Sequence, residues 1–313
     1  MGLAQWLLAP ENPLVARVAV NRLWEMVFGT GIVATTEDFG LQGEFPSHPE
    51  LLDWLAVEFR ESGWDVQHML RLLLTSEAYA LSSRVRPDLA ERDPENRLLA
   101  RGSRRRLHAE ALRDNALHIG GLLVERFGGP SVKPYQPEGL WQEVAMLQSN
   151  TRVYERGEGE ALWRRSVYTY WKRACPPPAM LTLDAPTREF CNIRRMNTNT
   201  PLQALVLWND EQFVEAARAF AARTLGEAAK DDERLALAFR RTTSRHPDAD
   251  ELALLRAALA DFRARYASAP ADAQALVEVG EAPVPAGSDA AELAAWTLLC
   301  SSLLNLDATI CRS

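Results

Sequence analysis

Apolar residues recur along most of this chain with the three- and four-residue spacing of amphipathic helices. This pattern predicts helices over residues 12–29, 49–62, 65–74, 103–119, 231–244, 248–266 and 289–306. Residues 165–172 instead alternate aromatic and β-branched positions, which is typical of a strand, and residues 180–184 are the expected partner. We therefore predict a mainly α, multi-helix globular fold with a small extended or β piece around residues 165–185.

The 313 residues, of which 47% are hydrophobic, are enough to bury a large core. We expect one helical domain over residues 1–313. The alternative is a subdivision into an N-terminal helical part, residues 1–150, and a polar loop with a C-terminal helical scaffold, residues 151–313.

The most unusual stretch is residues 184–210. Its first half gathers charged and amide side chains within sixteen residues: Asp184, Arg188, Glu189, Arg194, Arg195, Asn197 and Asn199. Thr200 and Gln203 then form a capping box, with Pro201 at the first helical position. The apolar spacing that follows predicts a single, mostly buried helix of about 22 residues.

This polar loop has two interpretations. Free amides at the start of the helix, together with the nearby arginines, favour a site for an anion. Alternatively, the arginines and carboxylates pair with one another and cap the helix, because structural ion-pair networks resemble functional clusters. The sequence gives the two interpretations equal weight.

If the loop is a site, its residue types suggest roles. Asp184 or Glu189 would act as acid or base, and Arg188 and Arg194 would stabilise developing negative charge. Aromatic side chains from residues 165–172 could complete the pocket. The substrate-binding candidates are Arg195, Asn197, Asn199, Tyr168, Trp171 and Lys172.

A second candidate lies on the helix predicted at 103–119. Glu110, Asp114 and His118 recur every four residues and therefore share one face. Two carboxylates and an imidazole can hold a divalent metal or perform acid–base chemistry. The alternative is a chance triple on an amphipathic helix, neutralised by Arg106 and Arg113. A divalent metal is therefore the one cofactor that the sequence suggests.

Several long motifs resemble a known family. They are NPLVARVAVNRLWEMVFGTGIV near the start, RRLHAEALRDNAL and RRSVYTYWKR in the middle, and DAPTREFCNIRRMNTNTPLQALVLWND at residues 184–210. In this order they resemble the domain of unknown function 1553 family, a planctomycete-type domain without a settled activity. The resemblance implies an exported or cell-surface bacterial protein in which a cytochrome-c-like module and a partner domain precede this one.

Charge and hydropathy exclude some partners. The formal net charge is −7 and the arginines are spread among acidic residues, which argues against nucleic acid. No apolar run reaches the roughly 18 residues that a membrane span needs. We expect no signal peptide in this chain, because Met1 leads into an amphipathic segment without a basic region.

Cysteine spacing indicates neither zinc nor haem. Cys175, Cys191, Cys300 and Cys311 form no C-x-x-C pair. In an exported protein they could form the disulfides 175–191 and 300–311, whereas otherwise they would be thiols. The apolar surroundings of Cys300 favour a buried thiol there.

Two functions remain open. The chain is either a binding or scaffolding module of a larger exported bacterial protein, or a hydrolase. The module would take a glycan, an ester-type or another small ligand, or dock the upstream domains. The hydrolase would cleave an ester, phosphoester or glycosidic bond by carboxylate acid–base chemistry, with or without a metal. It would use no serine nucleophile elbow, because Gly-x-Ser-x-Gly does not occur. We slightly favour the binding module.

Overall fold

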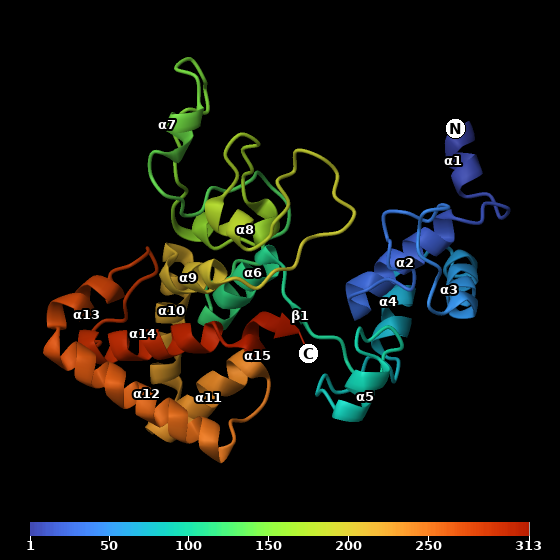
Figure 1. Cartoon of the computed structure of the whole chain (residues 1–313). Helices are drawn as coiled ribbons and strands as arrows, with labels where there is room; N and C mark the ends of the chain where they lie inside the picture. The colour runs from blue at the N-terminus through green and yellow to red at the C-terminus, as the bar shows by residue number, and fades with distance from the viewer. Residues whose placement is uncertain (313) are drawn as a thin grey trace. The chain divides into compact units, whose positions relative to one another are not determined.

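The computed structural model describes residues 1–312. Over that range the chain forms fifteen α-helices (Figure 1) and a two-stranded sheet of β1 (Arg105–Arg106) and β2 (Cys311–Arg312). The predicted mainly α fold with a small β piece is therefore confirmed. None of the described helices combines the length and apolarity required to cross a membrane. Each of the four cysteines, all within the described range, is a free thiol, and Cys300 is buried.

The chain divides into two compact units. One contains Met1–Arg105 together with Arg312, and the other contains Arg106–Cys311. The predicted alternative boundary after residue 150 lies inside the second unit. Whether the two units behave as one domain stays a prediction.

The first unit is a small helical core. Its helices are α1 (Gly2–Leu7), α2 (Val15–Phe28), α3 (Pro49–Glu61), α4 (Val66–Leu74) and α5 (Pro87–Arg92). Helix α2 packs against α3 and α4 and buries Val20, Leu55 and Met69 between them. Asp65 caps α4, because its carboxylate accepts from the amides of Gln67 and His68 at 2.8 and 3.0 Å.

Asn21 joins helix α2 to the loop that follows it. Its Nδ2 donates to the Val33 carbonyl at 3.0 Å and its Oδ1 accepts from the Val33 amide at 2.9 Å. The side chain is fully buried, so both polar groups of its amide are paired away from solvent. A Cβ at Gly31 would lie 2.5 Å from Asn21 Nδ2, so the loop can approach this closely only with glycine there.

The second unit is larger and surrounds two long helices. Its α-helices are α6 (Ala109–Gly120), α7 (Leu140–Val144), α8 (Pro178–Thr182), α9 (Pro201–Asn209), α10 (Glu211–Glu227), α11 (Asp231–Thr243), α12 (Ala249–Ser268), α13 (Pro270–Val277), α14 (Ala290–Leu304) and α15 (Asp307–Ile310). Helix α10 packs on α14 and α6, and α14 packs on α12 and α13. Figure 1 shows α14 crossing this unit with α10 and α12 beside it. Phe220 and Trp296 are fully buried at the centre.

The extended piece around residues 165–185 is shorter than predicted. Two isolated parallel bridges join Val124 to Arg164 and Val132 to Thr169. The expected partner strand at residues 180–184 is wrong, because Pro178 starts helix α8 there. Proline is favoured at the first position of a helix, where no amide donor is needed.

The helix predicted after residue 200 is interrupted. The capping box is confirmed, with the Thr200 amide donating to Gln203 Oε1 at 3.1 Å. However, α9 ends at Asn209 and α10 begins at Glu211, so the single helix of about 22 residues is wrong. Asp210 between them has an extended backbone, and its carboxylate caps α10 by accepting from the Gln212 amide at 3.1 Å.

Replacing Asn21 by alanine would leave the buried amide and carbonyl of Val33 without partners. We expect Asn21→Ala to lower the free energy of unfolding by about 2 kcal/mol or more. The exposed neighbour Arg22 is the matched control, and Arg22→Ala should change it by less than about 0.5 kcal/mol. Urea unfolding followed by circular dichroism measures both, and equal effects would contradict the assignment.

Candidate functional site

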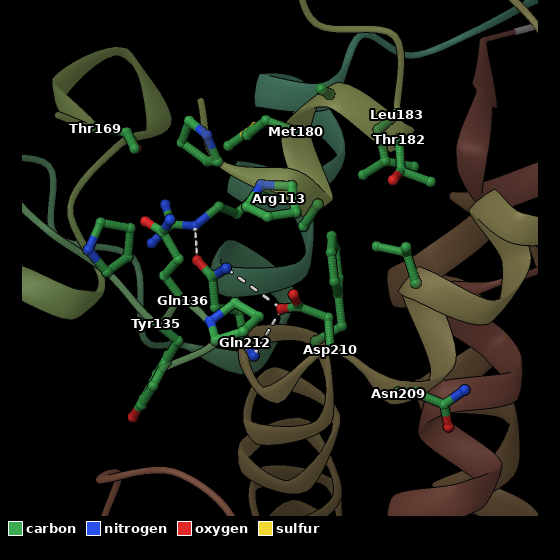
Figure 2. Close-up of a pocket in the computed structure, with 18 of the residues that line it drawn as sticks. Arg113, Tyr135, Gln136, Thr169, Met180, Thr182, Leu183, Asn209, Asp210 and Gln212 are labelled. Carbon is green, nitrogen blue, oxygen red and sulfur yellow. Dashed lines mark hydrogen bonds between the residues drawn. The ribbon is translucent and has the colours of Figure 1, made fainter. Parts of the chain in front are cut away.

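A cavity of 320 Å³ lies within the second unit. Helices α6, α8, α9 and α10 contribute to its wall, together with residues 134–137, Tyr154 and Thr169. Figure 2 shows Arg113, Gln212 and Asp210 lying next to one another along the cavity. Much of the remaining wall is apolar, and it includes Pro134, Pro177, Met180, Leu183 and Phe213.

Arg113 projects from helix α6 and is only 2% exposed. Its Nε donates to Gln212 Oε1 at 2.5 Å. Its Nη atoms donate to the carbonyls of Arg164 and Leu162 at 2.8 and 2.5 Å and to Ser166 Oγ at 3.2 Å. Burial lowers the pKa of Arg113 to about 10, so the guanidinium remains charged at neutral pH. Its hydrogen bonds fix it as a positive charge in the wall.

Gln212 connects Arg113 to Asp210. Because Gln212 Oε1 accepts from Arg113, its Nε2 is turned to Asp210 Oδ1, to which it donates at 3.3 Å. Burial raises the pKa of the Asp210 carboxyl above its ordinary value, although the Gln212 bonds and the Arg113 charge lower it in part. Figure 2 shows the second Asp210 oxygen pointing away from these bonds, into the cavity.

Two further residues in the wall have a buried polar atom without a hydrogen-bond partner among the described residues. Across residues 1–312, no hydrogen-bond partner is found for the buried atoms Thr169 Oγ1 and Gln136 Nε2. Thr169 is only 6% exposed, and both residues line the cavity. Buried polar atoms in folded proteins nearly always have a partner. A carboxylate, two unused polar groups and apolar walls together suit a small ligand with an apolar body and a polar head.

The carboxylate of Asp184, the first predicted catalytic residue, accepts hydrogen bonds from several neighbours. Its carboxylate accepts from Arg106 Nη2 at 2.5 Å, from the Thr198 amide and hydroxyl at 2.7 and 2.8 Å, and from Gln203 Nε2 at 3.2 Å. Its side chain is 13% exposed and that of Arg106 is 5% exposed. This geometry favours the structural interpretation, in which Asp184 closes the polar loop onto α9. Its catalytic role stays a prediction that these donors oppose.

The rest of the polar loop faces solvent. Arg188, Glu189, Arg194, Arg195, Asn197 and Asn199 are all exposed. Arg188 stacks over the Trp171 ring at 4.5 Å, and Asn197 Nδ2 donates to the Arg106 carbonyl at 3.2 Å. In the described chain, the lining of the cavity includes none of these six side chains and not Asp184. That these residues form a site of their own stays a prediction.

The three side chains predicted to bind a substrate from residues 165–172 instead form hydrogen bonds between loops. The Tyr168 hydroxyl accepts from the Gly128 amide at 2.8 Å. Trp171 Nε1 donates to the Thr187 carbonyl at 2.9 Å, and Lys172 Nζ donates to the Thr151 carbonyl at 2.6 Å. Within residues 165–172, the lining of the cavity includes Thr169.

Two of the three proposed metal ligands make other contacts. Glu110 pairs with Arg195 at 2.7 Å, and Asp114 Oδ1 accepts from the Ser166 amide and hydroxyl at 2.7 Å each. Burial alone would raise the pKa of Glu110, but the Arg195 hydrogen bond and other contacts lower it below its ordinary value. His118 is exposed. Over the described range, no group of three or more His, Cys, Asp or Glu could hold a metal ion, so the metal prediction has no support.

Sequence reasoning missed the residues that line this cavity. Arg113 was considered only as a neutralising charge, and Asp210 only as the end of the central stretch. Asp210 does carry a local signal, because an aspartate that interrupts an apolar run is typical of a helix N-cap. Gln136 and Thr169 carry no such signal, since their role depends on contacts that are distant in sequence.

Comparison with known proteins gives a family and nothing further. The family model described as PSD1, protein of unknown function (DUF1553), matches residues 1–259, in agreement with the resemblance of the motifs. No curated protein matches the chain. No solved structure matches it either.

Removing the Asp184 carboxylate would leave the buried Arg106 guanidinium uncompensated. We expect Asp184→Ala to lower the free energy of unfolding by about 3–5 kcal/mol, as for other broken buried ion pairs. Glu189→Ala, on an exposed side chain of the same loop, should have little effect. Guanidinium unfolding distinguishes the two, and an Asp184 variant of unchanged stability would contradict the structural role.

Proposed function

The chain belongs to the PSD1 family of proteins of unknown function (DUF1553), and we propose that it is a small-molecule-binding module. We place it within a larger exported bacterial protein, as the resemblance of its motifs implies. The observation that supports binding is that Thr169 Oγ1 and Gln136 Nε2, two buried atoms that none of the described residues bonds, belong to residues that line one cavity together with Asp210.

The cavity wall defines the ligand that fits it. Its volume of 320 Å³ lies at the lower end of small-molecule sites, so the ligand is compact. Its body is apolar, because prolines, Met180 and Phe213 cover much of the wall. Asp210 accepts from a donor on the ligand, while Thr169 and Gln136 donate to an acceptor. A primary amide on an aromatic ring has both groups.

Benzamide is therefore the probe for this site. We expect the wild-type chain to bind benzamide, because its NH₂ can donate to Asp210 and its carbonyl can accept from Thr169 or Gln136. Thr169→Val and Asp210→Asn should each weaken binding by about tenfold, which corresponds to ~1.4 kcal/mol. Asparagine preserves the capping of α10.

Ligand-observed NMR titration measures this affinity. Glu189→Gln is the control and should bind benzamide as the wild type does, because its exposed side chain lies outside the cavity lining. Binding that neither cavity variant weakens, or no binding by the wild type, would contradict the proposal.

One observation favours a hydrolase as the second candidate. Burial raises the pKa of Asp210, and a carboxylate with a raised pKa is a better general base nearer neutral pH. In this alternative, Asp210 takes the acid–base role that the sequence analysis gave to Asp184 or Glu189. The buried charge of Arg113 lies on the same wall and could stabilise negative charge that develops on the substrate.

For the hydrolase, we expect turnover of p-nitrophenyl acetate, p-nitrophenyl phosphate or a p-nitrophenyl glycoside. The rate should rise with pH as Asp210 loses its proton, with an inflection above 3.8, the ordinary carboxyl value. Asp210→Asn should reduce the rate by about 100-fold or more, because it removes the base. Release of p-nitrophenol measures turnover, and an equal rate in this variant would exclude Asp210 as the base.

A further inference from the structure

A second cavity of 690 Å³ adjoins the first. The two cavities share Gln136 and Tyr154 in their linings. Asp210 lines the first cavity and the next residue, Glu211, lines the second. The start of helix α10 therefore places one carboxylate in each cavity.

Trp141, which lines the second cavity, has a buried donor for which the described residues offer no acceptor. Trp141 is 2% exposed, and no partner for its Nε1 occurs in the part of the chain that the structure describes. An indole N–H in a folded protein usually finds a hydrogen-bond partner when buried. Gln136 Nε2, on the wall between the cavities, is unpartnered in the same way among residues 1–312. A ligand with several oxygen acceptors could bond both donors, Trp141 Nε1 and Gln136 Nε2.

The charges around this cavity favour a neutral ligand. Glu138 and Glu211 line it, so an anion would meet two carboxylates. A cation would meet Arg156 in the lining, although this guanidinium is paired with Glu281 at 2.5 Å. Lys133 adds positive charge next to the lining, because its ammonium lies 5.5 Å from the centre of the Trp141 ring.

Two lysines, Lys133 and Lys172, limit how a ligand can use the aromatic rings of this cavity. Lys172 Nζ lies 4.5 Å from the Trp141 ring centre, and Lys133 Nζ lies 5.9 Å from that of Tyr154. These cation–π contacts cover part of the ring faces on which a ligand would otherwise stack. Recognition therefore depends on hydrogen bonds at the edge of Trp141 and from the surrounding polar side chains.

We propose that the second cavity binds a neutral sugar, so that a glycoside with an apolar aglycone spans both cavities. Hydroxyl groups of the sugar donate to Glu138 and Glu211, and its oxygens accept from Trp141 Nε1 and Gln136 Nε2. The aglycone half rests on the function proposed above for the first cavity. The sugar half rests on the second cavity alone.

The test uses the whole chain and two matched sets of probes. Methyl glycosides of glucose, galactose, mannose and N-acetylglucosamine examine the second cavity, and the phenyl glycosides of the same sugars examine both. Benzamide examines the first cavity. Calorimetric titration should show at least one phenyl glycoside binding about tenfold or more tightly than its methyl counterpart, because the ring buries apolar surface.

Two variants identify the second cavity. Trp141→Phe removes the N–H and keeps an aromatic ring, and Glu211→Gln changes an exposed side chain that fills no part of the core. Each should weaken binding of the sugar by about fivefold or more and leave the affinity for benzamide unchanged. Glu143→Gln, an exposed carboxylate on α7 outside the cavity lining, is the control and should change neither. Thermal unfolding checks that Trp141→Phe is folded, and Glu211→Gln decides the question if it is not.

The outcomes separate the two proposals. Benzamide binding without binding of any glycoside, or glycoside binding that neither variant weakens, overturns the sugar site and leaves the first proposal standing. Methyl glycoside binding that both variants weaken, without benzamide binding, supports the sugar site and contradicts the first proposal. If no probe binds, both are wrong.

Discussion

The Asp210 carboxylate determines the geometry of the second unit where the first cavity lies. It caps α10 and thereby interrupts an apolar run that would otherwise continue as one helix. Burial of this charge is unfavourable, and the contacts with Gln212 and the positive charge of Arg113 offset part of the cost. The break places Asp210 in one cavity and Glu211 in the next.

Buried polar groups in this unit fall into two classes. Glu215 is fully buried and saturated, because its carboxylate accepts from Tyr135, Trp163 and the amides of Glu281 and Ala282. Asp184 is saturated in the same manner by its loop. Such groups hold the fold together.

Thr169, Gln136 and Trp141 belong to the second class, since none of the described residues bonds their buried polar atoms, and they line cavities. This contrast locates a ligand better than charge density does.

Charge density in the sequence pointed instead to the loop at residues 184–199. The start and the end of that loop are tied together and to α9 through Asp184, Thr198 and Gln203, while the charged and amide side chains between them are exposed. Arg195 is used in a pair with Glu110, which also removes Glu110 from the proposed metal set. Ion pairs between exposed groups resemble a functional cluster in sequence but not in space.

The sequence by itself determined the helical fold, the family and the capping box at Thr200, because periodicity and capping depend on neighbours within one or two turns. Only the tertiary structure decided that Asn21 is buried, that Asp184 is saturated and that Arg113, Asp210, Gln136 and Thr169 share a wall. Each of these facts depends on burial or on contacts between residues far apart in the chain. A linear pattern does not encode which polar atoms remain without a partner after packing. That property distinguishes the two cavities from the saturated surroundings of Asp184 and Glu215.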